Sequence, residues 1–176
     1  MTASIIFIAK YFRMKQSLII LFLFPLWMAA QDCKVKKTTD PYTKEVKVST
    51  GLMQFAGASL SIDADSKEID FLFSMDGKEK CFSDASVALV LYEGTKMKGN
   101  FRNGGPVNCE GFFHIIFRNG AVTPALLQRL ITQKIASIQF TGNNKSQTTV
   151  TFSPEDQQIL MTRADCLIKE AKTLVK

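Results

Sequence analysis

The sequence has few of the residues that form metal and catalytic sites. It contains a single histidine, His114, and its four cysteines are far apart, without any C-x-x-C spacing: Cys33, Cys81, Cys109 and Cys166. Zinc ribbons and thioredoxin-like redox sites need paired cysteines at that spacing. A P-loop and a dinucleotide-binding fingerprint are also lacking. The sequence therefore predicts no catalytic residue, no metal ligand and no cofactor, and we expect a protein that is not an enzyme.

Long-range patterns are lacking too. The chain has no low-complexity tract, no repeat of solenoid length and no heptad array, which excludes fibrous and repeat architectures. Of its 176 residues, 46% are apolar and 22% are charged, a balance typical of folded proteins rather than of disordered ones. The length fits one domain, since domains commonly hold about 100–200 residues.

Residues 1–30 have the features of a secretory signal peptide. Lys10, Arg13 and Lys15 precede an apolar run of 13 residues, Leu18–Ala30, which ends in small side chains. A membrane-spanning helix needs about 20 residues, and Pro25 disfavours a continuous helix within this run. We therefore expect cleavage and export rather than an uncleaved membrane anchor.

Removal of residues 1–30 leaves one predicted domain, residues 31–176. Both Met1 and Met14 fit as the start of the signal peptide, and cleavage fits after Ala30 or after Gln31. The mature chain carries 19 basic residues (22 less the three in the signal peptide) and 16 acidic ones, a net charge of +3. Because the basic residues are scattered, we expect no nucleic-acid partner. We expect a secreted or periplasmic protein without a stable membrane span after cleavage.

The cysteines predict disulfides. All four lie beyond the signal peptide, and an even number in an exported domain favours oxidised pairs, with three possible pairings. In the helix predicted at the C-terminus, Cys166 points away from the apolar stripe and is available to tie down another segment. Cys33 begins the mature chain, which would otherwise fray. The favoured pairing is therefore Cys33–Cys166 together with Cys81–Cys109, and free thiols in a reducing compartment are the alternative.

Strand patterns dominate residues 42–117, where apolar and polar residues alternate. The run Val87–Tyr92 is apolar on both faces and predicts a central strand. Asp76-Gly77 predicts a tight turn that joins the strand ending at Met75 to the segment Cys81-Phe82. The other strands expected in this region cover residues 46–49, 60–63, 69–73, 96–101 and 111–117.

Helix signals follow in the last third of the chain. Thr123 and Pro124 predict the N-cap and first turn of a short helix that reaches about Gln133, with four apolar side chains facing inward: Leu126, Leu127, Leu130 and Ile131. Residues 135–140 and 147–152 predict a strand pair, and Ser153 predicts the N-cap of a long final helix. The fold class expected is α+β: a mostly antiparallel β-sheet with one short and one long C-terminal helix packed on it, stapled by disulfides.

Asp63, Asp65, Glu68 and Asp70 form the densest acidic cluster of the sequence. Asp63-x-Asp65 is similar to the start of a calcium-binding loop, but Glu68 stands where such a loop requires glycine. We interpret the cluster as a solvated hairpin turn rather than as a calcium site.

His114 and a repeated tetrapeptide are the remaining candidates. His114 lies in an apolar run, and no serine, cysteine or acid is placed by the sequence to support it as a general base. The alternation of residues 112–117 predicts instead that His114 is a strand residue on the less buried face. Phe-Arg-Asn-Gly occurs at residues 101–104 and again at residues 117–120. Arginine with glycine-flanked amides can bind anions, but repeated use of a favourable turn is the simpler interpretation.

Four short motifs mark the layout of the mature chain. Asp32-Cys33-Lys34 opens it, and Tyr42-Thr43-Lys44 leads into the first strand. Leu126-Leu127-x-x-Leu130 then precedes Lys134-Ile135-x-x-Ile138, and a helix with a cysteine closes the chain. With these features the layout resembles a group of small exported proteins of Bacteroidetes-type bacteria. The resemblance implies a periplasmic or extracellular location and the Cys33–Cys166 bond, but no activity, because none is established for that group.

Three functions fit these observations. The leading hypothesis is a non-enzymatic exported domain that binds a protein or envelope partner, because the scaffold offers no convergent set of titratable residues. The second is a module that holds a small apolar ligand between sheet and helices, since ten phenylalanines (14 less the four in the signal peptide) remain after export. The third, and least expected, is a hydrolase with a site around His114 and the acidic cluster.

Overall fold

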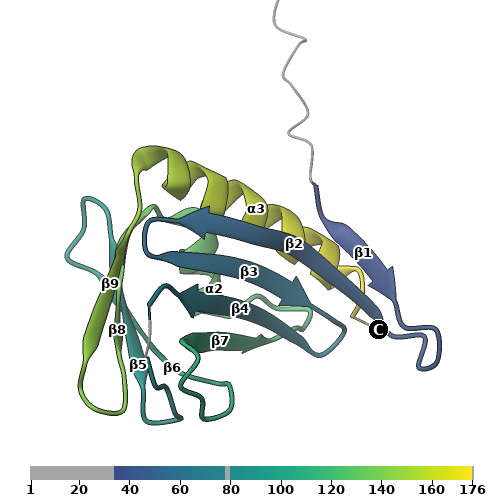
Figure 1. Cartoon of the computed structure of the whole chain (residues 1–176). Helices are drawn as coiled ribbons and strands as arrows, with labels where there is room; N and C mark the ends of the chain where they lie inside the picture. Colours follow the sequence, from purple (N-terminus) through teal and green to yellow (C-terminus); the bar gives the residue numbers. More distant parts are fainter. Residues whose placement is uncertain (1–33, 78–79, 176) are drawn as a thin grey trace, which may run out of the picture. The chain divides into compact units, whose positions relative to one another are not determined.

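The computed structural model describes residues 34–77 and 80–175 (Figure 1). The predicted signal peptide at residues 1–30, the candidate start residues, the cleavage positions and Cys33 lie outside the described residues. Expectations about them therefore stay predictions.

The described residues form two antiparallel β-sheets and two α-helices. The five-stranded sheet has the order β1-β2-β3-β4-β7, with strands at Lys36–Thr39, Val46–Phe55, Ala58–Ala64, Glu68–Met75 and Phe112–Arg118. The four-stranded sheet has the order β6-β5-β8-β9, with β5 at Val87–Tyr92, β6 at Lys98–Arg102, β8 at Ile135–Thr141 and β9 at Gln147–Thr151. The helices are α2, Ala125–Thr132, and α3, Pro154–Lys172. The predicted α+β class is confirmed, although the strands divide between two sheets where one was expected.

The strands follow the alternation of the sequence. In β4, Ile69, Phe71 and Phe73 are buried while the residues between them are half-buried. Strand β7 repeats the pattern with Phe113 and Ile115 inside and His114 on the other face. The five-stranded sheet therefore has one face in the core and one face in partial contact with solvent, as expected for an antiparallel sheet.

Aromatic rings fill the space between the two sheets. Phe140 of β8 stands against Phe73 of β4 and Phe113 of β7, with 5.2 and 5.1 Å between ring centroids. Phe82 closes the cluster from the segment before β5, at 5.4 Å from Phe113. Phenylalanine packing of this kind, edge to face or tilted, adds to the free energy gained by burial. The phenylalanines therefore act as core residues, which is the ordinary use of such side chains.

Helix α3 covers the core face of the five-stranded sheet. It packs on β2 and β3 and against α2 (Figure 1). Five of the six positions expected in its apolar stripe are buried: Leu160, Ala164, Leu167, Ile168 and Ala171. The sixth, Val175, lies beyond the end of the helix and is half-buried, and Gln157 is buried in addition. Ser153 caps the helix as predicted, because its hydroxyl accepts from the Asp156 amide and the Asp156 carboxylate accepts from the Ser153 amide. Neither of these two described helices is long and apolar enough to cross a membrane.

Two local expectations are wrong. Helix α2 has Pro124, not Thr123, at its N-cap and no side-chain cap bond. Leu126 is 41% exposed rather than inward-facing, although the other three predicted positions of the helix are buried.

The turn predicted at Asp76-Gly77 follows Met75, and Gly77 has the left-handed conformation, with φ +98°, that such a turn favours. Residues 78–79 lie outside the described residues, so the course of the chain from this turn to Cys81 stays a prediction. Strand β4 itself pairs with β3 and β7, and Phe82 pairs with Asn108.

The Cys81–Cys109 disulfide is present as predicted. It lies next to the isolated bridge between Phe82 and Asn108, whose backbone groups exchange two hydrogen bonds of 2.8 and 3.0 Å. Cys166 is also disulfide-bonded. Its predicted partner, Cys33, lies outside the described residues, so the Cys33–Cys166 pairing stays a prediction.

Candidate functional site

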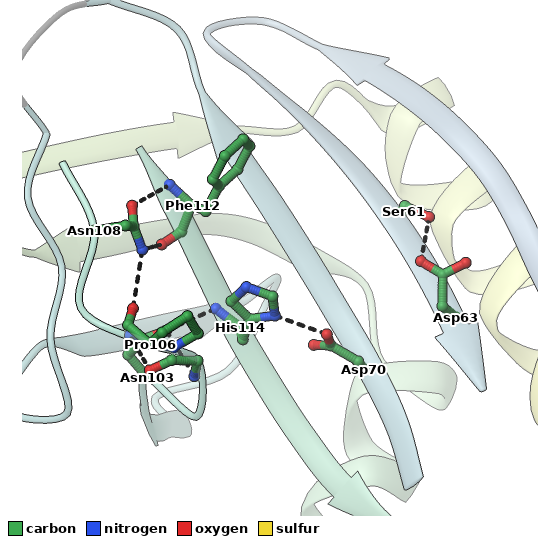
Figure 2. A network of polar contacts seen from close by, with 9 residues as sticks. Ser61, Asp63, Asp70, Asn103, Pro106, Asn108, Phe112 and His114 are labelled. Atoms are coloured by element: carbon green, nitrogen blue, oxygen red, sulfur yellow. Dashed lines mark hydrogen bonds and ion pairs between the residues drawn. The ribbon is translucent and has the colours of Figure 1, made fainter. Parts of the chain in front are cut away.

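His114 and Asp70 form a hydrogen-bonded pair on the half-buried face of the five-stranded sheet. The distance from His114 Nδ1 to Asp70 Oδ2 is 2.7 Å, and the side chains are 19% and 21% exposed (Figure 2). In the β4–β7 register, Leu72 lies opposite His114 and Asp70 lies opposite Ile116, so the two polar residues are diagonal neighbours. The expectation that no acid is placed to support His114 is therefore wrong.

The electrostatics of Asp70 are set by its burial. Burial raises the pKa of Asp70 above the ordinary carboxyl value of 3.8; the hydrogen bond and charge of His114 oppose the rise, whereas Asp63 and Glu68 add to it. Asp63 is the direct cross-strand neighbour of Asp70 and accepts a 2.6 Å hydrogen bond from the Ser61 hydroxyl. Asp70 Oδ1 is buried and has no hydrogen-bond partner among the described residues.

The loop of residues 103–111 covers this pair. The His114 amide donates to Asn103 Oδ1 at 2.8 Å, and the Gly104 amide donates to the His114 carbonyl at 2.9 Å. Gly105 lies against the imidazole ring so closely that a Cβ there would collide with it. Figure 2 shows the imidazole between the loop that carries Asn103 and the Asp70 carboxylate.

Asparagine side chains pair with the outer edge of β7. The Phe112 amide donates to Asn108 Oδ1 at 3.1 Å, and Asn108 Nδ2 donates to the Phe112 carbonyl at 2.9 Å. The side chains of Asn108 and Asn103 thus bind the backbone groups of β7 that a further strand would otherwise bind. This part of the sheet edge therefore has its hydrogen bonds satisfied. The Cys81–Cys109 disulfide fixes the loop that carries both asparagines.

Among the described residues, Asp70 is the side chain hydrogen-bonded to the His114 ring, and no serine, threonine or cysteine side chain is bonded to it. Of the rest of the acidic cluster, Asp63 and Glu68 stay close enough to Asp70 to raise its pKa, whereas Asp65 lies in a turn. Asp65 accepts from the amides of Lys67 and Glu68 at 2.7 and 3.0 Å in a turn, which confirms the turn interpretation for this residue. No group of three His, Cys, Asp or Glu side chains in the described part of the chain is arranged to hold a metal ion.

The two Phe-Arg-Asn-Gly copies have the same local role. In each, phenylalanine is buried at the end of a strand, and Asn103 and Asn119 are only 4% and 5% exposed. Asn103 binds β7, as described above. Asn119 Nδ2 donates to the carbonyls of Asp65 and Ala171 at 2.7 and 2.8 Å, so it joins the β3–β4 turn to the last turn of α3. Each copy therefore ends a strand, with a buried asparagine as the tether, and the turn interpretation stays a prediction.

Three residues of the second copy, Arg118, Asn119 and Gly120, also line a cleft of about 1040 Å³. The C-terminal end of α3 approaches the start of β2 (Figure 1), and residues at both of these ends line the cleft. Four segments build it: residues 43–46, residues 66–67, residues 118–122 and residues 173–175. Sequence reasoning missed this site; the one available signal was the arginine and glycine of the second tetrapeptide, noted above as an anion-binding possibility.

Positive charge exceeds negative charge in the cleft. Lys44, Lys67 and Arg118 line it, and Glu45 is the one acidic side chain among its lining residues. Glu45 Oε1 is 3.6 Å from Lys67 Nζ, which partly neutralises that pair. Lys44 and Arg118 make no ion pair with any described residue. Two cations of the cleft are therefore available to a ligand.

The remaining lining mixes aliphatic and polar side chains. Val46, Val122, Leu174 and Val175 contribute aliphatic surface, and Val122 is 83% exposed. The polar members are Asn119 and three hydroxyl residues, Thr43, Ser66 and Thr173. Two carbonyls hold Asn119 Nδ2, and Asn119 Oδ1 is buried, without a hydrogen-bond partner among the described residues.

Comparisons of the chain with protein-family models, with curated proteins and with solved structures find no match.

Proposed function

We propose that this chain is an exported, non-enzymatic binding domain, and that the cleft at the end of α3 holds its partner. Export is inferred from the signal-peptide features of residues 1–30, and the Cys81–Cys109 disulfide agrees with an oxidising compartment. A concave surface with aliphatic walls and a few polar groups is the usual form of a binding site.

One observation carries the proposal: two unpaired cations, Lys44 and Arg118, meet an exposed aliphatic side chain, Val122, in the same cleft. A single exposed aliphatic side chain is ordinary, but Val122 shares this cleft with Val46, Leu174 and Val175, and apolar side chains gathered beside charged ones are typical of interaction sites. A partner that covers Val122 and neutralises the cations would remove both features from solvent.

The alternative of a small apolar ligand between sheet and helices has less support. Phe73, Phe113 and Phe140 fill the space between the two sheets with ring contacts near 5 Å. A ligand there would have to displace these rings, at a cost comparable to that of opening a core cavity.

A hydrolase is the second candidate because of the Asp70–His114 pair. A panel of nitrophenyl esters and phosphates, assayed with the wild-type protein and with His114→Ala, tests it directly. Turnover that the substitution abolishes would replace the binding proposal by an enzymatic one. We expect no turnover above background, since Gly105 covers the ring.

The binding proposal is tested with the exported protein purified in its oxidised form and immobilised. Envelope fractions of the producing cells are passed over the wild-type protein and over the double variant Lys44→Gln, Arg118→Gln. The matched control is Lys98→Gln, Arg102→Gln, which removes the same charge from the exposed positions of β6. We expect a specific partner that the wild type and the control retain and the cleft variant loses. A partner retained equally by all three would contradict the proposal.

A further inference from the structure

We infer that the partner segment held in the cleft is an acidic peptide with aliphatic side chains. This inference rests on the proposed function and names the chemistry of the partner. Three properties of the cleft carry it: its charge, its aliphatic side chains and its hydroxyl groups.

Charge selects an acidic partner. Lys44, Lys67 and Arg118 against Glu45 give the lining a net charge of +2. The C-terminal end of α3 faces the same cleft and carries the negative end of the helix dipole, worth about half a charge. Hydrogen bonds from Asn119 Nδ2 and the Leu174 amide to the Ala171 carbonyl reduce that effect. The cleft therefore remains positive and attracts carboxylates.

The aliphatic side chains of the cleft favour a partner that carries aliphatic side chains as well as carboxylates. Val46, Val122, Leu174 and Val175 supply branched surface, and no aromatic residue lines the cleft. Binding of sugars or bases normally uses stacking on aromatic rings, so a carbohydrate or a nucleic acid fits poorly. An inorganic anion would leave most of the 1040 Å³ and all of the aliphatic surface uncovered.

Polar groups of the lining select a ligand that can form hydrogen bonds. Thr43, Ser66 and Thr173 line the cleft with hydroxyl groups, which both donate and accept. A peptide backbone supplies N–H donors and carbonyl acceptors at regular intervals between its side chains, whereas the chain of a fatty acid supplies neither. A peptide thus matches the charge, the aliphatic side chains and the hydroxyl groups of the cleft at once.

The test uses three hexapeptides, each acetylated and amidated at its ends. The acidic probe is Glu-Leu-Asp-Val-Glu-Leu, the neutral probe is Gln-Leu-Asn-Val-Gln-Leu, and the basic probe is Lys-Leu-Lys-Val-Lys-Leu. Titration calorimetry with the oxidised exported protein should show binding of the acidic peptide and binding about tenfold weaker, or undetectable, for the other two. Raising the salt concentration from about 50 mM to about 500 mM should weaken the binding of the acidic peptide, because salt screens the attraction between charges.

Variants of the protein test whether the acidic peptide binds in the cleft. We expect Arg118→Gln to weaken the binding of the acidic peptide about threefold, and the double variant Lys44→Gln, Arg118→Gln to weaken it about tenfold. The control Lys98→Gln should bind the peptide as the wild type does. In nitrogen-15 spectra the side-chain amide signals of Asn119 should move when the acidic peptide is added. Equal thermal unfolding of all variants shows that the fold is intact.

Failure of this inference is distinguishable from failure of the proposed function. If the envelope partner depends on Lys44 and Arg118 but the acidic peptide binds no better than the neutral one, the inference is overturned and the binding function stands. If neither the partner nor the peptide responds to these substitutions, both are overturned. Preference for the basic peptide would also overturn the inference.

Discussion

His114 Nδ1 lies 2.7 Å from Asp70 Oδ2, which joins the two strands at the edge of the five-stranded sheet beneath the 103–111 loop. The pair is held from three sides: Asp63 lies across β3–β4 from the carboxylate, Asn103 binds the His114 backbone, and Gly105 packs on the ring. We interpret it as a brace that positions the loop, and its carboxylate gives the domain a specific dependence on pH.

Asp70→Asn should change that dependence. Because burial raises the pKa of Asp70 in the folded state, the folded protein holds this proton more tightly than the unfolded chain does. The resulting stability is fully present below the ordinary carboxyl value of 3.8 and is lost as pH rises through the raised folded pKa. Asparagine does not titrate, yet it still offers an oxygen to His114.

Urea unfolding at a series of pH values between about 3 and about 7 measures the effect. Relative to Asp70→Asn, the wild type should lose free energy of unfolding as pH rises above the ordinary carboxyl value. Parallel curves for the two proteins across this range would mean that the carboxylate is not perturbed by folding.

Replacing Cys81 and Cys109 together by serine should lower the free energy of unfolding by about 2–4 kcal/mol, chiefly through the unfolded chain. The bond closes a segment with a sequence separation of 28. Locally, hydrogen exchange at the His114 and Phe112 amides should accelerate, because Asn103 and Asn108 hold these amides from the loop that the disulfide anchors. The amide of Val150 in β9, far from the loop in the sheet order, is the internal control. An unchanged exchange rate at His114 would show that the loop stays in place without the disulfide.

Tyr92→Phe should raise the free energy of unfolding by up to about 1 kcal/mol. The Tyr92 hydroxyl is buried and has no hydrogen-bond partner among the described residues, and burial raises its pKa, opposed by the charge of Arg129. Removing the oxygen therefore removes a desolvation cost and little else. Tyr42→Phe, at a side chain that is 92% exposed, should change nothing. A clear loss of stability in Tyr92→Phe would reveal a partner for this hydroxyl.

Asn119→Ala should lower the free energy of unfolding by about 2–4 kcal/mol, because it removes two hydrogen bonds and leaves the carbonyls of Asp65 and Ala171 unpaired. Asn100→Ala, at an exposed position of β6, serves as the matched control and should stay within about 0.5 kcal/mol of the wild type. Thermal and urea unfolding of both variants and the wild type measure these differences in the free energy of unfolding. Equal stability of the two would contradict the tether role of Asn119.

The export premise has its own test in intact mass and thiol labelling. We expect the product to begin at Gln31 or Asp32 and to take up no alkylating reagent before reduction, since both predicted pairs, Cys33–Cys166 and Cys81–Cys109, would be oxidised. A full-length product inside the cell with four alkylatable cysteines would contradict the premise.

Much of the fold could be predicted because its signals are local. Alternation in β4 and β7 identifies Ile69, Phe71 and Phe113 as core residues, and Ser153 with Asp156 marks the start of α3. Strand β1 could not be predicted, because all four of its residues are exposed and it owes its conformation to pairing with β2. The division into two sheets was missed for a similar reason, since a period of two shows which face is buried but not which strand lies beside it.

The candidate sites depend on packing between distant segments. Asp70 and His114 are 44 residues apart, and they meet only because β4 pairs with β7 in one register. The cleft joins the start of β2, the end of β7 and the end of α3, and no single stretch of sequence contains more than a part of it. Arg118 was noted in its tetrapeptide, but its partners in space, Lys44 and Val122, carry no local signal.

Site-specific photo-crosslinking in the producing cells tests the central claim most directly. A photoreactive residue replaces Val122 in the cleft or, in a matched strain, Val107 on the loop over His114; the two positions are 83% and 71% exposed. The account predicts a discrete crosslinked product from position 122 that disappears with Lys44→Gln, Arg118→Gln, and none from position 107. A product from position 107 with none from position 122 would contradict it and would place the binding surface over the Asp70–His114 pair.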